Sequence, residues 1–327
     1  MRITVASLAH FSKGAAASSW LAAIVMLVFT GITQAAETRW KEGYIPNVPV
    51  VTQDGRTLLF YDDVMKGRIS IISFIYTSCR DVCPVVTARL SQLEDKLGDS
   101  AGREYFFVSI SIDPVNDTPD KLKDYSKAFG IGAGWLFLTG KAQDIELIRH
   151  RLGERSRALT EHRNEVLLFN DMTGEWERNS AFGDINVLAS AVRAMDPVQR
   201  AAVRPTEQAN AGTFVDDPLN LPGQALFLKT CGGCHTIGRG NRVGPDLQGV
   251  STRRSRDWLT AYIMEPEKMR AGKDPLALAL TQKYPAVRMP NLGLSEFDSS
   301  DVIAYIEAMT YAKRAEESTP HAHHHHH

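Results

Sequence analysis

The five residues from Cys231 to His235 constrain this chain more than any other part of its sequence, because they read Cys-Gly-Gly-Cys-His. A Cys-x-x-Cys-His motif is the pattern for covalent haem attachment, in which two thiols bind the porphyrin and the adjacent histidine binds the iron. The motif therefore predicts one haem c, attached through Cys231 and Cys234, with His235 as an axial iron ligand. A zinc site would instead need a second pair of Cys or His residues nearby.

A haem held by one histidine still needs a second axial ligand from a distant segment. Ligation by one histidine and one methionine is typical of electron-transfer cytochromes. Four methionines follow the motif: Met264, Met269, Met289 and Met309. Met264 and Met309 fall in helical patterns, where packing in a core explains them. Met289 stands in an extended segment directly before Pro290.

Residues 217–313 resemble a class I cytochrome c. The likeness rests on the attachment motif, the Gly244-Pro245 loop, the Met289-Pro290 segment and a closing helix. Helical periodicity predicts helices over 221–229, 255–264 and 299–311. The resemblance implies an all-α cytochrome c domain in which Met289 is the distal iron ligand and the backbone of Pro245 is the partner of His235.

Residues 37–195 alternate between strand and helix patterns, which predicts an α/β domain around a mixed sheet. Apolar runs predict strands over 70–76, 105–112, 135–139 and 165–169. Helical patterns fall over 84–97, 118–129, 142–152 and 184–195. The following residues, 196–216, mix polar residues, alanines and prolines without sustained periodicity, so we interpret them as an interdomain linker.

Two further cysteines, Cys79 and Cys83, lie between the predicted strand 70–76 and the predicted helix 84–97. A disulfide that closes so short a loop adds little stability, so chemistry explains the pair better. Their placement matches a thioredoxin-like active site, with a spacer of three residues instead of two. A helix start stabilises thiolates. Two thiolates suit Cu(I), and an added imidazole gives a site that also holds Cu(II).

This half of the chain resembles the Sco (SenC) family of thioredoxin-fold copper proteins. The resembling segments are residues 74–84, residues 111–119 and the loop and strand that follow His162. In that family two cysteines and one histidine bind copper, which implies Cys79, Cys83 and His162 as copper ligands here. Arg80 stands where the family commonly has proline, and its charge favours a thiolate while it opposes a bound cation.

The resemblance implies a metallochaperone that delivers copper to the binuclear copper centre of a cytochrome c oxidase. The fused haem would then pass single electrons to or from the copper or the thiols. The alternative is a thiol–disulfide oxidoreductase in which Cys79 attacks and Cys83 resolves the mixed disulfide. A haem carries one electron, whereas the reduction of a disulfide takes two. Copper changes by one electron and therefore matches the haem better. A plain electron carrier between respiratory proteins is a third possibility, but it would leave Cys79 and Cys83 without a role.

Residues 1–36 are predicted to be a signal peptide or membrane anchor, because basic residues precede an apolar run and then Ala35-Ala36. This places the protein in the periplasm or on the exoplasmic face of a bacterial inner membrane. The tail, 314–327, ends in a histidine run that looks like a purification tag. With a net charge of -1, nothing indicates nucleic acid as a partner. The expected partners are the copper-centre subunit of an oxidase, other copper or thiol proteins, and redox proteins.

Overall fold

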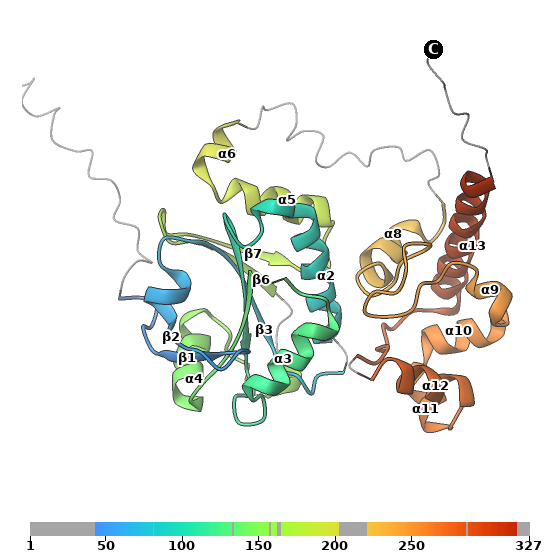
Figure 1. Ribbon diagram of the computed structural model, residues 1–327, viewed down its shortest axis with the longest axis horizontal. Coiled ribbons are helices and arrows are strands. Elements are labelled where there is room, and N and C mark those ends of the chain that lie inside the picture. Colours follow the sequence, from blue (N-terminus) through green and yellow to red (C-terminus); the bar gives the residue numbers. More distant parts are fainter. Residues whose placement is uncertain are drawn as a thin grey trace, which may run out of the picture. The chain divides into compact units, whose positions relative to one another are not determined.

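The computed structural model describes residues 43–80, 82–132, 134–156, 158–161, 165–202, 221–285 and 287–318. Residues 43–202 form an α/β domain and residues 221–318 form a helical domain (Figure 1). The predicted order, an α/β domain followed by an all-α domain, is confirmed. The predicted export segment, residues 203–216 of the predicted linker and the histidine tail lie outside the described residues.

A seven-stranded mixed sheet with the order β2-β1-β5-β4-β3-β6-β7 forms the centre of the α/β domain. The strands are β1 Pro49–Thr52, β2 Thr57–Leu59, β3 Ile69–Ile75, β4 Tyr105–Ser111, β5 Trp135–Thr139, β6 Glu165–Asn170 and β7 Glu175–Ser180. The central strands β3, β4 and β5 run parallel, and β6, β7, β1 and β2 pair antiparallel. The two short strands β1 and β2 were not predicted from the sequence, and they extend the sheet beyond β5.

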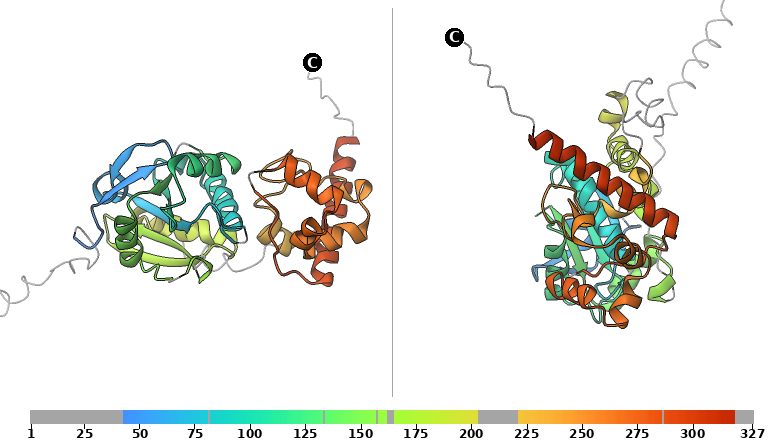
Figure 2. Two further views of the ribbon diagram at one scale, coloured as in Figure 1. Left: turned by 90° about the horizontal axis from the view of Figure 1, so that it is seen from below. Right: turned by 90° about the vertical axis from the view of Figure 1, so that its right-hand side faces the viewer.

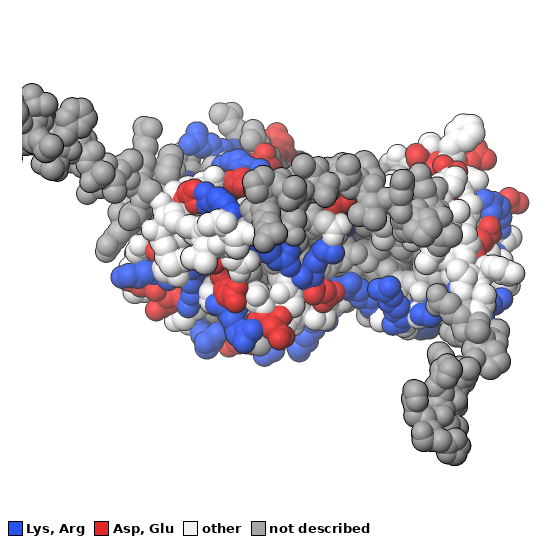
Figure 3. Space-filling model, turned by 90° about the horizontal axis from the view of Figure 1, so that it is seen from above, with Lys and Arg blue, Asp and Glu red and all other residues white. Residues whose placement is uncertain are grey.

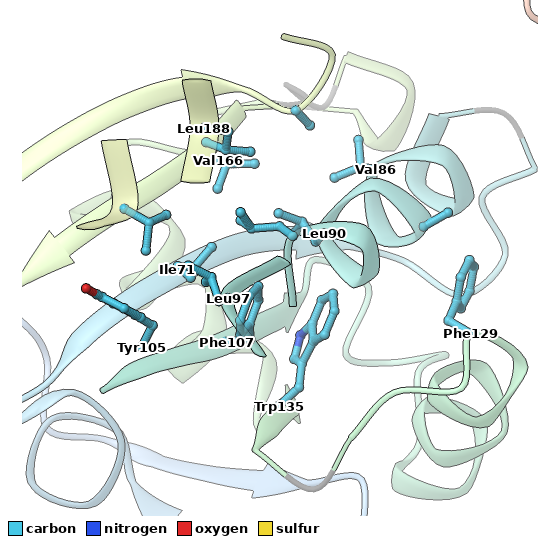
Figure 4. Close-up of a cluster of buried hydrophobic side chains, with 14 of the residues drawn as sticks. Ile71, Val86, Leu90, Leu97, Tyr105, Phe107, Phe129, Trp135, Val166 and Leu188 are labelled. Atoms are coloured by element: carbon cyan, nitrogen blue, oxygen red, sulfur yellow. The ribbon is translucent and has the colours of Figure 1, made fainter. Parts of the chain in front are cut away.

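Side chains alternate between the two faces of the sheet along each strand, and each face builds its own core. On β3, Ile71 and Ile75 belong to one buried cluster, whereas Ile72 belongs to the other. Figure 4 shows part of the first cluster, in which Leu90 of a covering helix lies over Phe107 and Trp135. Because both faces of the sheet are covered, β3 reads as a continuous apolar run in the sequence.

Helices cover both faces of this sheet. They are η1 Phe60–Met65, α2 Val82–Leu97, η2 Gly98–Ser100, α3 Pro119–Ala128, α4 Ala142–Arg151, η3 Leu159–Glu161, α5 Ile185–Ala194 and α6 Pro197–Ala202. Residues of α2, α3 and α5 pack in the first cluster, and residues of η1 and α4 pack in the second. Helix α6 lies within the predicted linker, so the first part of that segment is helical.

Two of these helices have side-chain caps, and the start of a third, α2, places the first cysteine pair. The side chains of Thr118 and Asp184 cap α3 and α5, accepting hydrogen bonds from amides in the first turn. Helix α2 begins at Val82, two residues before the predicted start at Pro84. As a result Cys83 lies inside the first turn of α2, and Cys79 lies in the loop that joins β3 to the helix.

The helical domain is built from α8 Gln224–Leu226, η4 Phe227–Cys231, α9 Val250–Arg253, α10 Arg256–Met264, α11 Pro266–Ala271, α12 Pro275–Lys283 and α13 Glu296–Ser318. A small core joins Phe227 to Val302, Tyr305 and Ile306 of the long terminal helix, which both views in Figure 2 show in dark red. Helix α13 is longer than the predicted 299–311 because it continues into the predicted tail.

Among the described residues no helix combines the length and apolar character needed to cross a bilayer. Basic and acidic side chains are interspersed on the face seen in Figure 3.

Candidate metal centres

A tight turn brings Cys231, Cys234 and His235 to the wall of one cavity. The helix that starts at Gln224 widens into a single π-type turn over Phe227–Cys231. The amides of Cys234 and His235 then donate to the carbonyl oxygen of Cys231, at 3.0 and 2.9 Å. Burial raises the pKa of both thiols, that of Cys234 to about 12. Both cysteines are free, so their sulfurs are available for thioether bonds.

The ring of His235 is held by a loop that folds over it. Its Nδ1 atom lies 2.8 Å from the carbonyl oxygen of Pro245, which can only accept, so Nδ1 carries the proton. Burial lowers the pKa of His235, which favours a neutral ring with its Nε2 lone pair free to bind a metal. A Cβ atom at Gly244 would lie 2.5 Å from Cε1 of His235, so only glycine fits beside the ring.

The cavity in front of His235 fits a haem. Its volume is about 440 Å³, within the range of cofactor sites. Its lining includes Cys231, Cys234, His235, Met289, Trp258, Leu259, Tyr262, Ile263, Tyr284, Ile303 and Ile306, with the basic residues Arg253, Arg254, Lys283 and Arg288. Among the described residues, the buried hydroxyl of Tyr284 finds no hydrogen-bond partner. Apolar walls, cationic side chains and an unsatisfied donor match a porphyrin with two carboxylates, so the residues present suit the predicted group.

Of the four methionines downstream of the motif, Met289 alone lines this cavity. Both terminal nitrogens of Arg270 donate to the carbonyl oxygen of Met289 at 3.2 Å, which fixes the backbone of its extended loop. Met309 packs instead against the core around Phe227, in line with the packing role expected from its helical position. The structure thus places Met289 and His235 on the wall of the same cavity, while iron ligation by Met289 stays a prediction.

Asp246 organises the loop between the haem motif and Pro245, a role that the sequence did not suggest. Its carboxylate accepts hydrogen bonds from the amides of Gly238, Arg239 and Gly240 and from the hydroxyl of Thr236, at 2.6 to 2.9 Å. Partial burial alone would raise the pKa of Asp246, but these donors together lower it to about 2. The carboxylate therefore stays ionised and holds the loop in one shape.

The pair Cys79 and Cys83 forms the second candidate centre. The amide of Cys83 lies 3.4 Å from Sγ of Cys79, so the first sulfur sits at the amino end of α2. Cys83 is 1% exposed whereas Cys79 is partly exposed, and neither forms a disulfide. A hydrogen bond with the Cys79 thiol, together with burial, raises the pKa of Cys83. The spacing of four therefore brings both sulfurs to one side of the helix start.

Asp117 holds the loop that carries Cys79. It is 1% exposed, and its carboxylate accepts hydrogen bonds from the hydroxyl of Thr77 at 2.5 Å and from the hydroxyl of Ser111 at 2.6 Å. The backbone amide of Thr77 also lies 3.2 Å from it. Asp117 does not cap the following helix, because the side chain of Thr118 caps α3. Asp117 instead ties the end of β4 to the residues just before the dithiol.

The third predicted copper ligand, His162, lies outside the described residues. Eight residues before it, Glu154 accepts hydrogen bonds from the amide and hydroxyl of Ser156. Arg149 donates to the backbone of the same serine at 3.0 Å. Within the described ranges no group of three or more His, Cys, Asp or Glu side chains could hold a metal ion. A copper site made by Cys79, Cys83 and His162 therefore stays a prediction.

Two family models match separate parts of the chain. The sequence model of the SCO1/SenC family matches residues 48–171, and that of the cytochrome c family matches residues 221–310. Among curated relatives, the "SCO1 protein homolog" of Bacillus subtilis is 34% identical over 92 residues, which cover 28% of this chain and 46% of the relative. A "SCO2-like protein" of Rickettsia felis is 35% identical over 97 residues, covering 30% and 45%.

The chain thus spans about half the length of the curated relatives it matches. Among solved structures, a SCO1/SenC family lipoprotein from Bacillus anthracis is 22% identical with a TM-score of 0.41, covering 48% of this chain and 95% of that one. Bradyrhizobium japonicum ScoI, solved with copper bound, is 20% identical with a TM-score of 0.39, covering 46% and 99%.

Proposed function

We propose that this chain, which joins a Sco-family domain to a cytochrome c domain, binds copper and serves the assembly of the copper centre of a cytochrome c oxidase. The observation that carries the proposal is the pair of unbridged cysteines at the start of α2, where the amide of Cys83 lies 3.4 Å from the sulfur of Cys79. Cysteine sulfurs select Cu(I), and a histidine added to them also accommodates Cu(II). We assign that third position to His162.

The haem domain would serve this site as a one-electron partner. A haem attached at Cys231 and Cys234 supplies one electron per turnover, and the conversion of Cu(II) to Cu(I) consumes one. Two of the chain's own residues support this exchange: His235 is held in one tautomer by Pro245, and Met289 lines the same cavity. A ligand set of histidine and methionine leaves the iron without an open position, which suits electron transfer.

The alternative function is a thiol–disulfide oxidoreductase, and one observation favours it. Cys79 is partly exposed whereas Cys83 is buried behind it, which is the division between an attacking and a resolving thiol. Two electrons must then pass for each disulfide, so one haem would have to act twice. Copper needs no such repetition, and we therefore rank copper handling first.

Metal titration of the haem-loaded full chain separates the two functions. The copper function predicts one equivalent of Cu(I) or Cu(II) bound by the native protein and a large loss of Cu(II) affinity in His162→Ala. His150→Ala is the matched control, since His150 is exposed on α4 and should change nothing. If His162→Ala bound copper as the native protein does while its dithiol still cycled, the oxidoreductase would be the better account.

We also propose export of the protein through residues 1–36, with both redox domains in the periplasm or on the exoplasmic face of the membrane. The support is the basic, apolar and small-residue order of that segment. Fractionation of cells that express the native chain, with and without residues 2–36, tests it: haem attachment and periplasmic recovery should both depend on the segment. Cytoplasmic accumulation of the full native chain would contradict export.

A further inference from the structure

The loop that carries Met289 depends on one side chain of a neighbouring helix. Residues 287–292 lie between α12 and α13 and belong to no helix or strand. Within the described ranges, Arg270 of α11 supplies the hydrogen bonds that reach the backbone of residues 287–290. Its two terminal nitrogens both donate to the carbonyl oxygen of Met289, at 3.2 Å. A segment with so few hydrogen bonds of its own opens easily unless such a contact holds it.

The guanidinium of Arg270 is suited to holding a carbonyl oxygen. It is permanently charged, and its planar fork can direct two N–H groups at one acceptor. The side chain is 10% exposed, and the carboxylate of Glu267, one turn earlier on α11, lies 3.8 Å from Nη2. Hydrogen bonds from a charged donor are stronger than neutral ones, and exclusion of water strengthens them further. Arg270 is therefore a firm anchor for the Met289 backbone.

The same guanidinium also contacts the wall of the haem cavity. Tyr262 of α10 is 9% exposed and lines that cavity, as Met289 does. Burial raises the pKa of Tyr262, while Arg270 opposes the rise through its charge and through a hydrogen bond between the two side chains. Arg270 thus holds the backbone of one residue of the cavity wall and the hydroxyl of another, and it fixes the two relative to each other.

Tyr262 is itself supported by neighbouring helices. Its ring stacks on that of Trp258, with 4.8 Å between the ring centroids and 14° between the planes. Nε1 of Trp258 donates to the carboxylate of Asp274 at 3.2 Å, and Asp274 caps α12 by accepting from the amide of Ala277 at 2.8 Å. Helices α10, α11 and α12 contact one another in turn (Figure 1). Three consecutive helices therefore give Arg270 a fixed frame from which to hold the loop.

We propose that Arg270 is the positioning residue for the distal haem ligand: by holding the carbonyl oxygen of Met289, it keeps this methionine at the haem cavity. The role belongs to the two-nitrogen fork and acts through Met289. Hydrogen bonds that orient a ligand from behind prepare a metal site and tune its properties. The proposal deepens the proposed electron exchange, because a ligand that stays in place lets the iron change oxidation state without an open position. It rests on Met289 as the distal ligand and needs no copper.

Imidazole binding to the ferric haem of the full chain measures how often the distal position opens. Added imidazole enters only when the methionine has left, so its apparent affinity rises with the open fraction. Arg270→Leu removes both donors, and we expect imidazole to bind roughly ten- to hundredfold more tightly than to the native protein. Lys268→Leu is the matched control and should match the native protein, because Lys268 lies on the same helix with its side chain 76% exposed. Native imidazole affinity in Arg270→Leu would overturn the positioning role.

Arg270→Lys keeps the test valid if Arg270→Leu fails to fold. Lysine retains the charge and the apolar stem but lacks the planar fork. We expect imidazole to bind roughly three- to tenfold more tightly than to the native protein, because one of two donors is lost. If the charge alone mattered, Arg270→Lys would bind imidazole as the native protein does, and that result would overturn the proposal.

The Met289→Ala background separates this role from the ligand assignment. Once the methionine is gone, Arg270→Leu should change imidazole affinity by less than about twofold, because the two substitutions act on one step. A further tightening of about tenfold in the double variant would mean that Arg270 acts elsewhere and would overturn the proposal. If Met289→Ala alone kept the native imidazole affinity, the ligand assignment and the positioning role would both fail, while copper binding by Cys79 and Cys83 would be unaffected.

Discussion

The Nδ1 atom of His235 lies 2.8 Å from the carbonyl oxygen of Pro245, in a loop whose preceding residue, Gly244, lies against the same imidazole ring. The contact fixes the tautomer and orientation of the histidine before any metal binds. The haem centre is therefore organised by its loop as much as by the five residues of the attachment motif.

Gly244→Ala should disturb this arrangement. Its new Cβ atom would lie 2.5 Å from Cε1 of His235, so either the ring or the loop must move. We expect overpacking to destabilise the haem domain by about 1–3 kcal/mol and to produce a fraction of high-spin Fe(III) haem. Denaturation followed by haem absorbance measures both. Gly183→Ala is the control, because the nearest atom there lies at an ordinary 3.4 Å.

Met289→Ala should open the distal side of the iron. Met289 lines the haem cavity, and a histidine–methionine pair raises the haem potential. We expect a high-spin ferric spectrum, rapid binding of added imidazole and a lower midpoint potential. Met309→Leu, in the core around Phe227, should keep the native spectrum at a stability cost below about 1.5 kcal/mol. A native spectrum in Met289→Ala would assign the distal ligand to another residue.

Asp246 gives the haem domain a defined acid sensitivity. Its donors lower its pKa in the folded protein to about 2, from an ordinary value of 3.8. A depressed folded pKa means that the stabilisation is present above the unfolded value and is lost as the pH falls from about 4 towards 2. Asp246→Asn should therefore unfold more easily by about 1–2 kcal/mol at pH 7. The difference in the free energy of unfolding between the native protein and Asp246→Asn should close near pH 2. Denaturant titrations at pH 7 and near pH 2 measure it.

Asp117→Ala should loosen the dithiol loop. The carboxylate is buried and accepts from both Thr77 and Ser111, so its removal leaves buried donors without an acceptor. We expect a loss of about 2–3 kcal/mol in the free energy of unfolding of the α/β domain. We also expect weaker copper binding, since Thr77 precedes Cys79 by two residues. Asp113→Ala removes an acceptor from the exposed side chain of Asn116 and should have a smaller effect on both. Equal effects of the two variants would contradict a special role for Asp117.

The sequence predicts those parts of the fold that have a clear pattern of their own. The continuous apolar runs gave β3 and β4 to within one residue, and Thr118 and Asp184 marked the starts of α3 and α5. Strands β1 and β2 have four and three residues, too few for a recognisable alternation. Their place in the sheet depends on pairing with distant β5, which no local pattern reveals.

The candidate sites divide in the same way. Cys231, Cys234 and His235 were found because they are adjacent, and Cys79 and Cys83 because they share one helix start. Asp246 and Asp117 act by accepting hydrogen bonds from backbone amides and hydroxyls, some of them on distant segments, so their roles become visible only in three dimensions.

The central claim is that one chain passes single electrons between its haem and a copper site made by Cys79, Cys83 and His162. The direct measurement reduces the haem of the full chain under anaerobic conditions and adds one equivalent of Cu(II), while the haem spectrum is followed with time. We predict oxidation of one haem per copper in the native protein, and its loss in Cys79→Ser/Cys83→Ser, with Cu(I) retained only by the native chain. A native haem that stays reduced for minutes after Cu(II) has bound, or that oxidises equally fast without the cysteines, would contradict the account.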